Sequence, residues 1–345
     1  MSNPTTGTDA AAPNALLENA GLDVIAESER KGRPRDLFMP WFAANISVLG
    51  LSWGAWVLSF GLNAVQAIIA GTIGITFSFF LCGVMAVLGK RGSAPTLALS
   101  RAAFGYNGNR LSAVISWMLT VGWETVLCIL ATLASATVLE ALGWHNTVGA
   151  QIVGFLMTVG LAASAGILGF DTIMKVQTWI TWATGVLTVI YLILVAGRID
   201  WTALGSLPAG NAAAFIGALV MVATGFGLGW VNAAADYSRY LPRTASTVGV
   251  VGWTTTGAAL PCVILIIAGT LLVGSDAELG EAINADPIGA LTTVLPTWFL
   301  IPFAIVAILG LVAASLWTCT PRVFRFWPPG CRCAVTWLRA LMPRL

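Results

Sequence analysis

Long apolar segments, each of about 19 residues or more, recur along most of this chain. A helix needs about 20 apolar residues to cross the hydrocarbon core of a bilayer, so each segment is predicted to span a membrane. Hydrophobic residues make up 57% of the sequence and charged residues 9%, which leaves no soluble domain of useful size. We therefore expect an all-α polytopic membrane protein with about eight transmembrane helices. The predicted spans cover residues 39–58, 65–88, 111–138, 149–168, 173–196, 213–232, 248–273 and 298–316.

The basic residues between these spans gather on one side of the predicted membrane. Cytoplasmic loops collect Lys and Arg, so this asymmetry predicts a cytoplasmic N-terminus. The predicted location is the plasma (inner) membrane. Residues 1–38 are predicted to be a cytoplasmic tail, because their basic end leads directly into a full-length span without a small-residue cleavage site. The basic loop residues are Lys90, Arg91, Arg101, Arg110, Lys175, Arg239 and Arg243.

The sixth apolar segment interrupts its own helical pattern. Gly225, Gly227 and Gly229 alternate through its middle, and Trp230 follows them directly. Irregular backbone inside a membrane is tolerated only where it is buried in protein or lines a wet cavity, and broken helices build substrate sites in secondary transporters. The indole of Trp230 offers a stacking face and one N–H donor to a planar solute. The alternative interpretation is that the glycines only let a neighbouring helix approach closely.

The first segment is interrupted in a similar way, by Gly50 and by small hydroxyl residues that include Ser52, a further candidate for substrate binding. Two broken spans five apart indicate inverted repeats whose discontinuous helices meet at mid-membrane. We expect a transmembrane domain over residues 39–316, with a first repeat over 39–197 and an incomplete second repeat over 212–316.

Glu124 lies inside the third segment, where a carboxyl group is costly and marks a functional site by default. It is a candidate to bind a substrate N–H or to carry a coupling proton; the alternative is a structural Glu that is hydrogen-bonded to a neighbouring helix. Asn45 and Asn232 each lie beside a broken segment, where they either contact substrate or cap freed backbone groups. Tryptophans near span ends are predicted to anchor at the membrane interface: Trp41, Trp144, Trp201 and Trp298.

Other classes of function fit the composition poorly. His145 is the only histidine, the cysteines lack zinc-site spacing, and the charges sit in loops without forming a basic surface for nucleic acid. We expect no metal and no cofactor beyond a coupling cation. A membrane-embedded enzyme would need a nucleophile–base pair or metal ligands at mid-membrane, where the chain supplies chiefly Glu124, so an enzyme is not expected.

Four motifs together resemble the nucleobase:cation symporter-1 family, within it the purine–cytosine permease branch. They are WFAANISVLG at residues 41–50, GxxPTLxLSRxxFGYxGNR at 92–110, GWE at 122–124 and GWxNxxADYSRYLP at 229–242. The resemblance covers roughly residues 21–314. It implies a LeuT-type fold of inverted five-helix repeats that imports nucleobases or related heterocycles with a proton or sodium ion. Members of the family stack the planar ring between tryptophans that match Trp123 and Trp230.

This chain departs from the family pattern at several positions. Fungal relatives place an amide about one turn after the third-span tryptophan, whereas this chain has Leu127, so Glu124 or Thr125 would have to supply the polar contact. The middle of the eighth span lacks the hydroxyls that sodium-coupled relatives use, which favours a proton as the coupling ion. The block from Asp236 to Tyr240 is expected to act in gating or stability. The resemblance leaves open whether the solute is cytosine, a purine, a hydantoin or a vitamin ring.

Residues 317–345 are unlike the rest of the chain and are rich in Trp, Cys, Pro and Arg. Where the family continues with an Asp/Asn-x-Tyr-Ser motif, codons for residues 316–322 can be chosen so that a shifted frame reads Val-Asp-Leu-Tyr-Ser-Ser. We therefore hypothesise an out-of-frame tail and a truncated second repeat. The predicted function is secondary active import of nucleobases by cation symport and alternating access. The alternative is a truncated remnant of such a permease that does not transport.

Overall fold

The computed structural model describes residues 24–167 and 170–318, and every regular element within these ranges is helical. The long helices are α3 (Ala64–Gly92), α5 (Arg101–Ala141), α6 (Thr147–Ile167), α7 (Phe170–Ala196), α9 (Ala212–Ala223), α11 (Thr247–Gly274) and α14 (Thr297–Thr318). The shorter ones are α1 (Phe38–Asn45), α2 (Leu49–Leu58), α4 (Thr96–Leu99), α8 (Trp201–Ser206), α10 (Ala234–Ser238), α12 (Ala277–Ala285) and α13 (Gly289–Thr293). The predicted tail at residues 317–345 lies almost entirely outside the described residues.

Each predicted span overlaps a helix or a broken pair of helices. By length and composition, 5 helices in the described part of the chain can cross a membrane, or up to 6 if the bent pair α1–α2 is counted as one span. Helices α6 and α14 contribute shorter apolar stretches, Thr147–Gly160 and Trp298–Leu311. The protein is therefore a multi-pass helical membrane protein, as the hydropathy pattern predicts.

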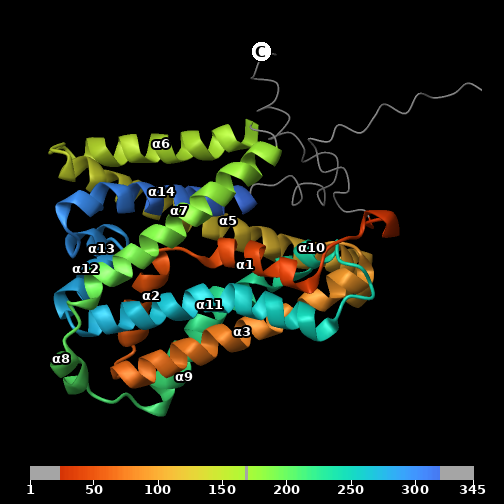
Figure 1. Cartoon of the computed structure of the whole chain (residues 1–345), viewed down its shortest axis with the longest axis horizontal. Helices are drawn as coiled ribbons and strands as arrows, with labels where there is room; N and C mark the ends of the chain where they lie inside the picture. The colour runs from red at the N-terminus through yellow and green to blue at the C-terminus, as the bar shows by residue number, and fades with distance from the viewer. Residues whose placement is uncertain (1–23, 168–169, 319–345) are drawn as a thin grey trace, which may run out of the picture.

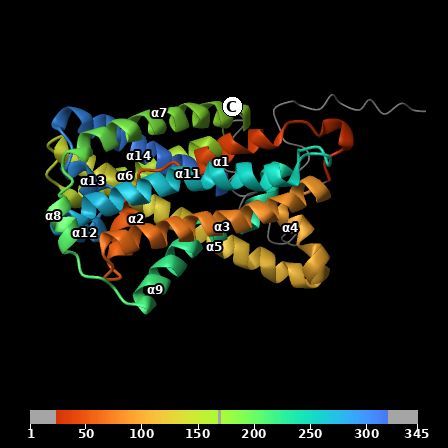
Figure 2. The ribbon, with the colours of Figure 1, turned by 60° about the horizontal axis from the view of Figure 1, so that its bottom comes forward.

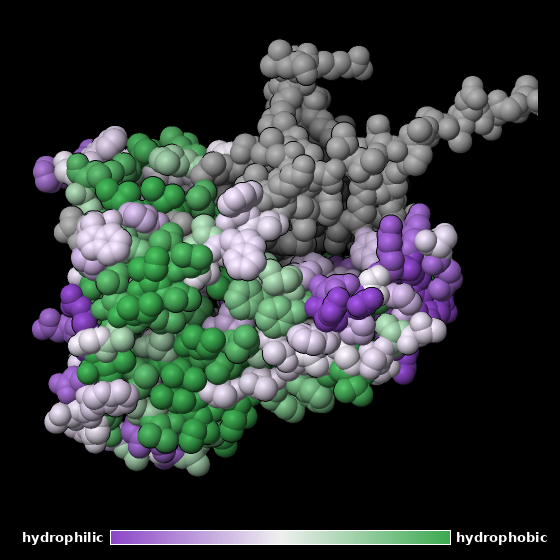
Figure 3. Space-filling model, in the orientation of Figure 1, coloured by the Kyte–Doolittle hydropathy of each residue, from purple (hydrophilic) through white to green (hydrophobic). Residues whose placement is uncertain are grey.

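The long helices lie side by side and the short ones gather at the two ends of the bundle (Figures 1 and 2). Helices α8, α12 and α13 lie at one end, and α4, α10 and the segment that precedes α1 lie at the other. Helix α11 packs against α3 and α2, while α5 packs against α6 and α14. Hydrophobic residues dominate the half of the visible face that lies away from the N-terminal segment, and hydrophilic residues gather at the end that holds that segment (Figure 3).

Local side-chain caps set where several helices begin. The Asn63 side chain accepts a hydrogen bond from the Gln66 backbone N–H (2.9 Å) at the start of α3, and Asn211 accepts one from Ala214 (2.9 Å) at the start of α9. Ser246 caps α11 in the same way. These polar residues precede apolar runs, so they satisfy backbone donors that the first helical turn leaves free.

Two spans are broken, as the sequence predicts. Helices α1 and α2 meet at a bend of 70° across residues 46–48. Gly50 lies after this interruption, in the first turn of α2, so the expectation that it breaks the helix is wrong; its missing side chain instead makes room for Leu265 of α11. The other broken span passes from α9 through a π-helical turn, η3 (Thr224–Leu228), and a 3-10 turn, η4 (Val231–Ala233), into α10.

The end of the N-terminal segment packs against the bundle. Its buried residue Arg30 donates hydrogen bonds to the backbone carbonyls of Leu241 (2.9 Å) and Lys90, which follow α10 and end α3. Glu27 accepts from Arg30 (2.9 Å) and from Arg243 (2.6 Å). Residues 24–37 therefore cover the ends of α3 and α10, which the prediction of a tail did not anticipate.

Candidate substrate-binding site

The glycines of the sixth segment differ in what they touch. A Cβ at Gly225 would overlap the Trp53 indole of α2, and a Cβ at Gly227 would overlap the backbone of Ser78 in α3. These two glycines therefore permit close packing, the alternative that the sequence left open. Gly229 has more space: the nearest side-chain atom to its virtual Cβ is Nε1 of Trp123, at 3.9 Å.

The backbone of the break is satisfied by groups from α3. Phe226 has φ −104° and ψ −107°, outside the helical region, so the regular ladder of hydrogen bonds stops there. The Gly227 N–H donates to the buried Ser78 hydroxyl (3.1 Å), and the Cys82 thiol lies 3.8 Å from the carbonyl oxygen of Trp230. Irregular backbone at this depth thus persists because protein groups replace the missing helical partners.

Trp123 of α5 and Trp230, between η3 and η4, are both half-buried and pack against the same hydrophobic core. Because Nε1 of Trp123 lies close to Gly229, its indole reaches the backbone immediately before Trp230. The structure therefore places the Trp123 indole against the chain segment that carries Trp230, at the break. Their indole faces suit a planar ring, and each N–H is a single donor.

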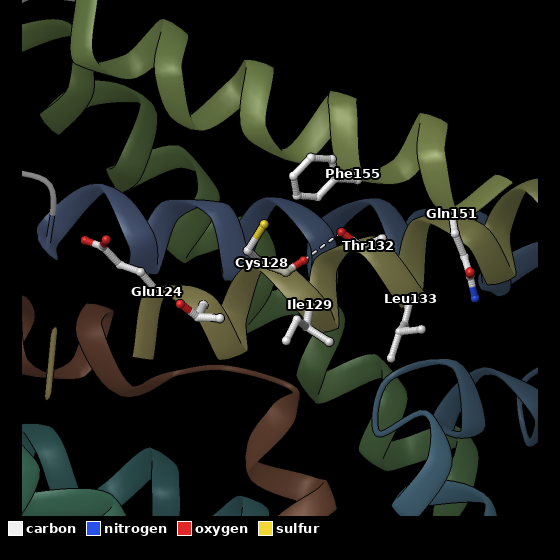
Figure 4. A pocket seen from close by; sticks show the side chains of 8 residues that line it. Glu124, Cys128, Ile129, Thr132, Leu133, Gln151 and Phe155 are labelled. Atoms are coloured by element: carbon white, nitrogen blue, oxygen red, sulfur yellow. Dashed lines mark hydrogen bonds between the residues drawn. The ribbon is translucent and has the colours of Figure 1, made fainter. Parts of the chain in front are cut away.

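Glu124 lies in a different place from the two tryptophans. It lines a cavity of about 510 Å³ between α5 and α6 that neither Trp123 nor Trp230 lines. Figure 4 shows Glu124 at one end of this cavity and Gln151 at the other, with Phe155 extending from α6 toward Cys128. Successive helical residues point about 100° apart, which separates Glu124 from its neighbour Trp123.

The remaining predicted residues make structural contacts. The Asn232 side chain donates to the Ser116 hydroxyl (2.8 Å) and so joins η4 to α5. The fully buried Ser52 hydroxyl donates to the carbonyl of Pro287 (2.6 Å), between α12 and α13, so the structure does not group it with the tryptophans. Thr125 is exposed and its hydroxyl donates to its own helix.

Sequence reasoning misplaced one aromatic residue. Trp41 was expected at the membrane interface, yet its side chain is fully buried. Its ring lies 5.9 Å from the Trp230 ring at an interplanar angle of 82°, and 5.3 Å from Tyr237. Trp144, Trp201 and Trp298, in contrast, are 44%, 70% and 66% exposed, and their anchoring at the interface stays a prediction. The motif around Trp41 could have predicted this burial, because the motif lies in a broken span.

The two broken spans meet at these aromatic residues. Trp53 of α2 contacts Phe226 of η3 at 4.6 Å between ring centroids, and Trp41 of α1 contacts Trp230. A membrane bundle in which two discontinuous helices meet is the architecture of secondary transporters. The fold and the site thus define the class of the protein as a transporter-type membrane bundle.

The chain belongs to the family of permeases for cytosine/purines, uracil, thiamine and allantoin, whose sequence model matches residues 24–319. It is 28% identical over 269 residues to the putative purine-cytosine permease YxlA of Bacillus subtilis, which covers 75% of this chain and 55% of that protein. It is 24% identical over 266 residues to the purine-cytosine permease FCY2 of Saccharomyces cerevisiae, covering 73% of this chain and 47% of that protein. The chain therefore spans about half the length of these curated relatives.

Solved structures show the same fold. Mhp1, a nucleobase-cation-symport-1 family transporter, matches in a closed conformation with bromovinylhydantoin bound, at a TM-score of 0.63 and 18% identity, over 90% of this chain and 70% of that one. Its inward-facing conformation matches at a TM-score of 0.64 and 18% identity, over 96% of this chain and 77% of Mhp1. The predicted family and the LeuT-type helical fold are confirmed.

Proposed function

We propose that this chain carries the substrate path of a secondary active importer for nucleobases or related planar heterocycles. The observation that carries the proposal is the placement of the Trp123 indole beside Gly229, the residue before Trp230, at the break of the sixth span. Two indoles there provide stacking faces for a planar ring, and stacking tolerates rings of differing substitution. The family membership and the nucleobase names of the relatives support the same class of solute. They also support a function other than catalysis.

Replacing either tryptophan with alanine tests the stacking. We expect Trp123→Ala and Trp230→Ala each to weaken cytosine binding about 5- to 150-fold, because one base–aromatic stack contributes about 1–3 kcal/mol. Trp201→Ala is the matched control, since Trp201 is 70% exposed on α8 and should leave binding unchanged. The measurement is equilibrium binding of radiolabelled cytosine, adenine and a hydantoin to the purified full chain. Unchanged binding in both variants rejects stacking between these residues.

For coupling we propose a proton, with Glu124 as the group that carries it. The support is a carboxyl on a membrane-spanning helix, beside a cavity between α5 and α6 whose lining surface is mostly apolar. In this scheme Glu124 acts at some distance from the stacked ring and senses the substrate through movement of α5 during alternating access. Ser52 is not part of the proposed site.

Glu124→Gln separates coupling from binding. The variant keeps the side-chain shape but cannot release a proton. Uptake into proteoliposomes should therefore no longer be stimulated by an inward-directed proton gradient, while cytosine binding is kept. Gln151→Ala, at the opposite end of the same cavity, controls for general disturbance of the α5–α6 contact. Stimulation by a sodium gradient instead of a pH gradient would contradict proton coupling.

The second candidate function is a folded remnant that does not transport. It is favoured by α5, where only 11% of the apolar window is buried in the described bundle. The same assays separate the two candidates. Binding without concentrative uptake indicates the remnant, whereas substrate accumulation against a gradient requires the importer.

A further inference from the structure

Trp41 occupies a buried position that no anchoring role explains. It lies in the second turn of α1, its side chain has no exposed surface, and its ring contacts two aromatic residues of the other broken span. A tryptophan that anchors a helix at the membrane surface keeps its polar edge near water. The surroundings of Trp41 therefore indicate a role inside the bundle.

The rings around Trp41 are arranged edge to face. The interplanar angle is 82° with Trp230 and 72° with Tyr237, at centroid distances of 5.9 and 5.3 Å. In the described part of the chain, Nε1 of Trp41 has no hydrogen-bond acceptor although it is fully buried. Perpendicular aromatic pairs gain energy from the positive edge of one ring and the negative face of the other, so the neighbouring rings are the natural partners of this indole.

The two tryptophans differ in how firmly the backbone holds them. Trp41 belongs to an α-helix, its carbonyl accepts from the Asn45 side chain (2.9 Å), and the Cys262 thiol of α11 lies 3.8 Å from Oδ1 of Asn45. Trp230 lies where a π-helical turn gives way to a 3-10 turn, with φ −94° and ψ −6°. At this change of helical geometry, contacts with neighbouring rings hold the plane of the Trp230 indole.

We propose that Trp41 is a positioning residue that sets the orientation of the Trp230 indole and, with it, the slot that faces Trp123. This inference rests on the proposed function, because it concerns selection among ligands at the same site. Trp41 acts through Trp230 and does not itself touch the solute, since it is fully buried. Its loss should change which ring fits the slot as well as how tightly a ring binds.

The effect should appear as a change in selectivity. Trp41→Leu removes the aromatic edge while it keeps the position apolar, and Trp41→Phe keeps an aromatic edge. We expect Trp41→Leu to weaken cytosine binding about 2- to 12-fold, the range of one aromatic pair, and to lower the preference for cytosine over the larger adenine. Trp41→Phe should stay within about twofold of the wild type. Phe299→Leu, a buried aromatic outside this cluster, should leave the cytosine-to-adenine ratio unchanged.

A second readout does not depend on ligand binding. 5-Fluorotryptophan placed only at position 230 of the full chain gives one ¹⁹F resonance that reports the ring environment. We expect a single line in the wild type and in Trp41→Phe, and a shifted or multiple line in Trp41→Leu. An unchanged ¹⁹F line in Trp41→Leu overturns the inference. If the wild type binds both bases, a cytosine-to-adenine ratio in Trp41→Leu equal to that of the wild type overturns it as well. If the wild type binds neither base, the proposed function fails while the fluorine signal still decides the role of Trp41.

Discussion

At the scale of single residues, the glycines of the broken span are required by their neighbours. Gly227 lies against the Ser78 backbone, where any side chain would overlap α3. Its N–H also donates to the Ser78 hydroxyl, so displacement of the two segments would cost a buried hydrogen bond. Gly229 has no such overlap and borders Trp123. Two glycines of one motif thus differ: Gly227 is required for packing, and Gly229 leaves room beside Trp123.

Gly227→Ala should destabilise the protein by about 1–3 kcal/mol, because overpacking forces the two segments apart. Gly252→Ala, in α11, is the matched control: nothing lies within 4 Å of its virtual Cβ, so the substitution should be neutral or stabilise by up to about 1 kcal/mol. Thermal unfolding of the purified variants in detergent measures the difference. Equal stability of the two variants would contradict the close approach of η3 and α3.

At the scale of elements, two distant motifs close one end of the bundle. Thr96, at the start of α4, donates from its backbone N–H (2.9 Å) and its hydroxyl (3.2 Å) to Asp236 of α10, and its hydroxyl accepts from Ala235. Arg30 adds a tie between the ends of α3 and α10 from the N-terminal segment. These contacts support a structural role for the block that begins at Asp236, one of the two roles expected for it.

Arg30→Ala should lower stability by about 1.5–3 kcal/mol, because it removes a charged donor and leaves the carbonyls of Leu241 and Lys90 without this partner. Arg35→Ala is the control, since the Arg35 side chain is 64% exposed and its nearest carboxylate is 3.9 Å away. Thermal unfolding and protease sensitivity of the N-terminal segment are the measurements. If both variants unfold alike, the segment does not contribute to the bundle.

At the scale of the whole molecule, charge and apolar surface divide along the long helices. The basic residues around α4, α10 and residues 24–37 lie at one end, and the acidic helix α12 lies at the other (Figures 1 and 2). We propose that the first end faces the cytoplasm, because basic residues are retained on that side. In this proposal the N-terminus is cytoplasmic and the membrane that holds the helices is the plasma membrane.

Cysteine labelling checks this orientation. In a background that lacks Cys128, Cys319, Cys331 and Cys333, Thr244→Cys should react with a membrane-impermeant maleimide only after the cells are permeabilised. Glu278→Cys, exposed on α12, should react in intact cells. The buried thiols Cys82 and Cys262 should not contribute to the signal. The reverse pattern of labelling would invert the proposed topology.

The sequence by itself determined the multi-pass helical class and the break in the sixth span. The pairing of Trp123 with Trp230 stays a prediction from family motifs. Hydropathy suffices for the multi-pass helical class because a backbone in hydrocarbon must bond within its own helix. Only the tertiary structure decided which face of each helix packs against a given neighbouring helix. Packing between the helices joins Ser52 to Pro287, 235 residues away. It also turns Glu124 toward α6 and buries Trp41 against Trp230. Apolar residues cover every side of these helices, so hydropathy carries no signal for facing, and packing between distant helices sets it.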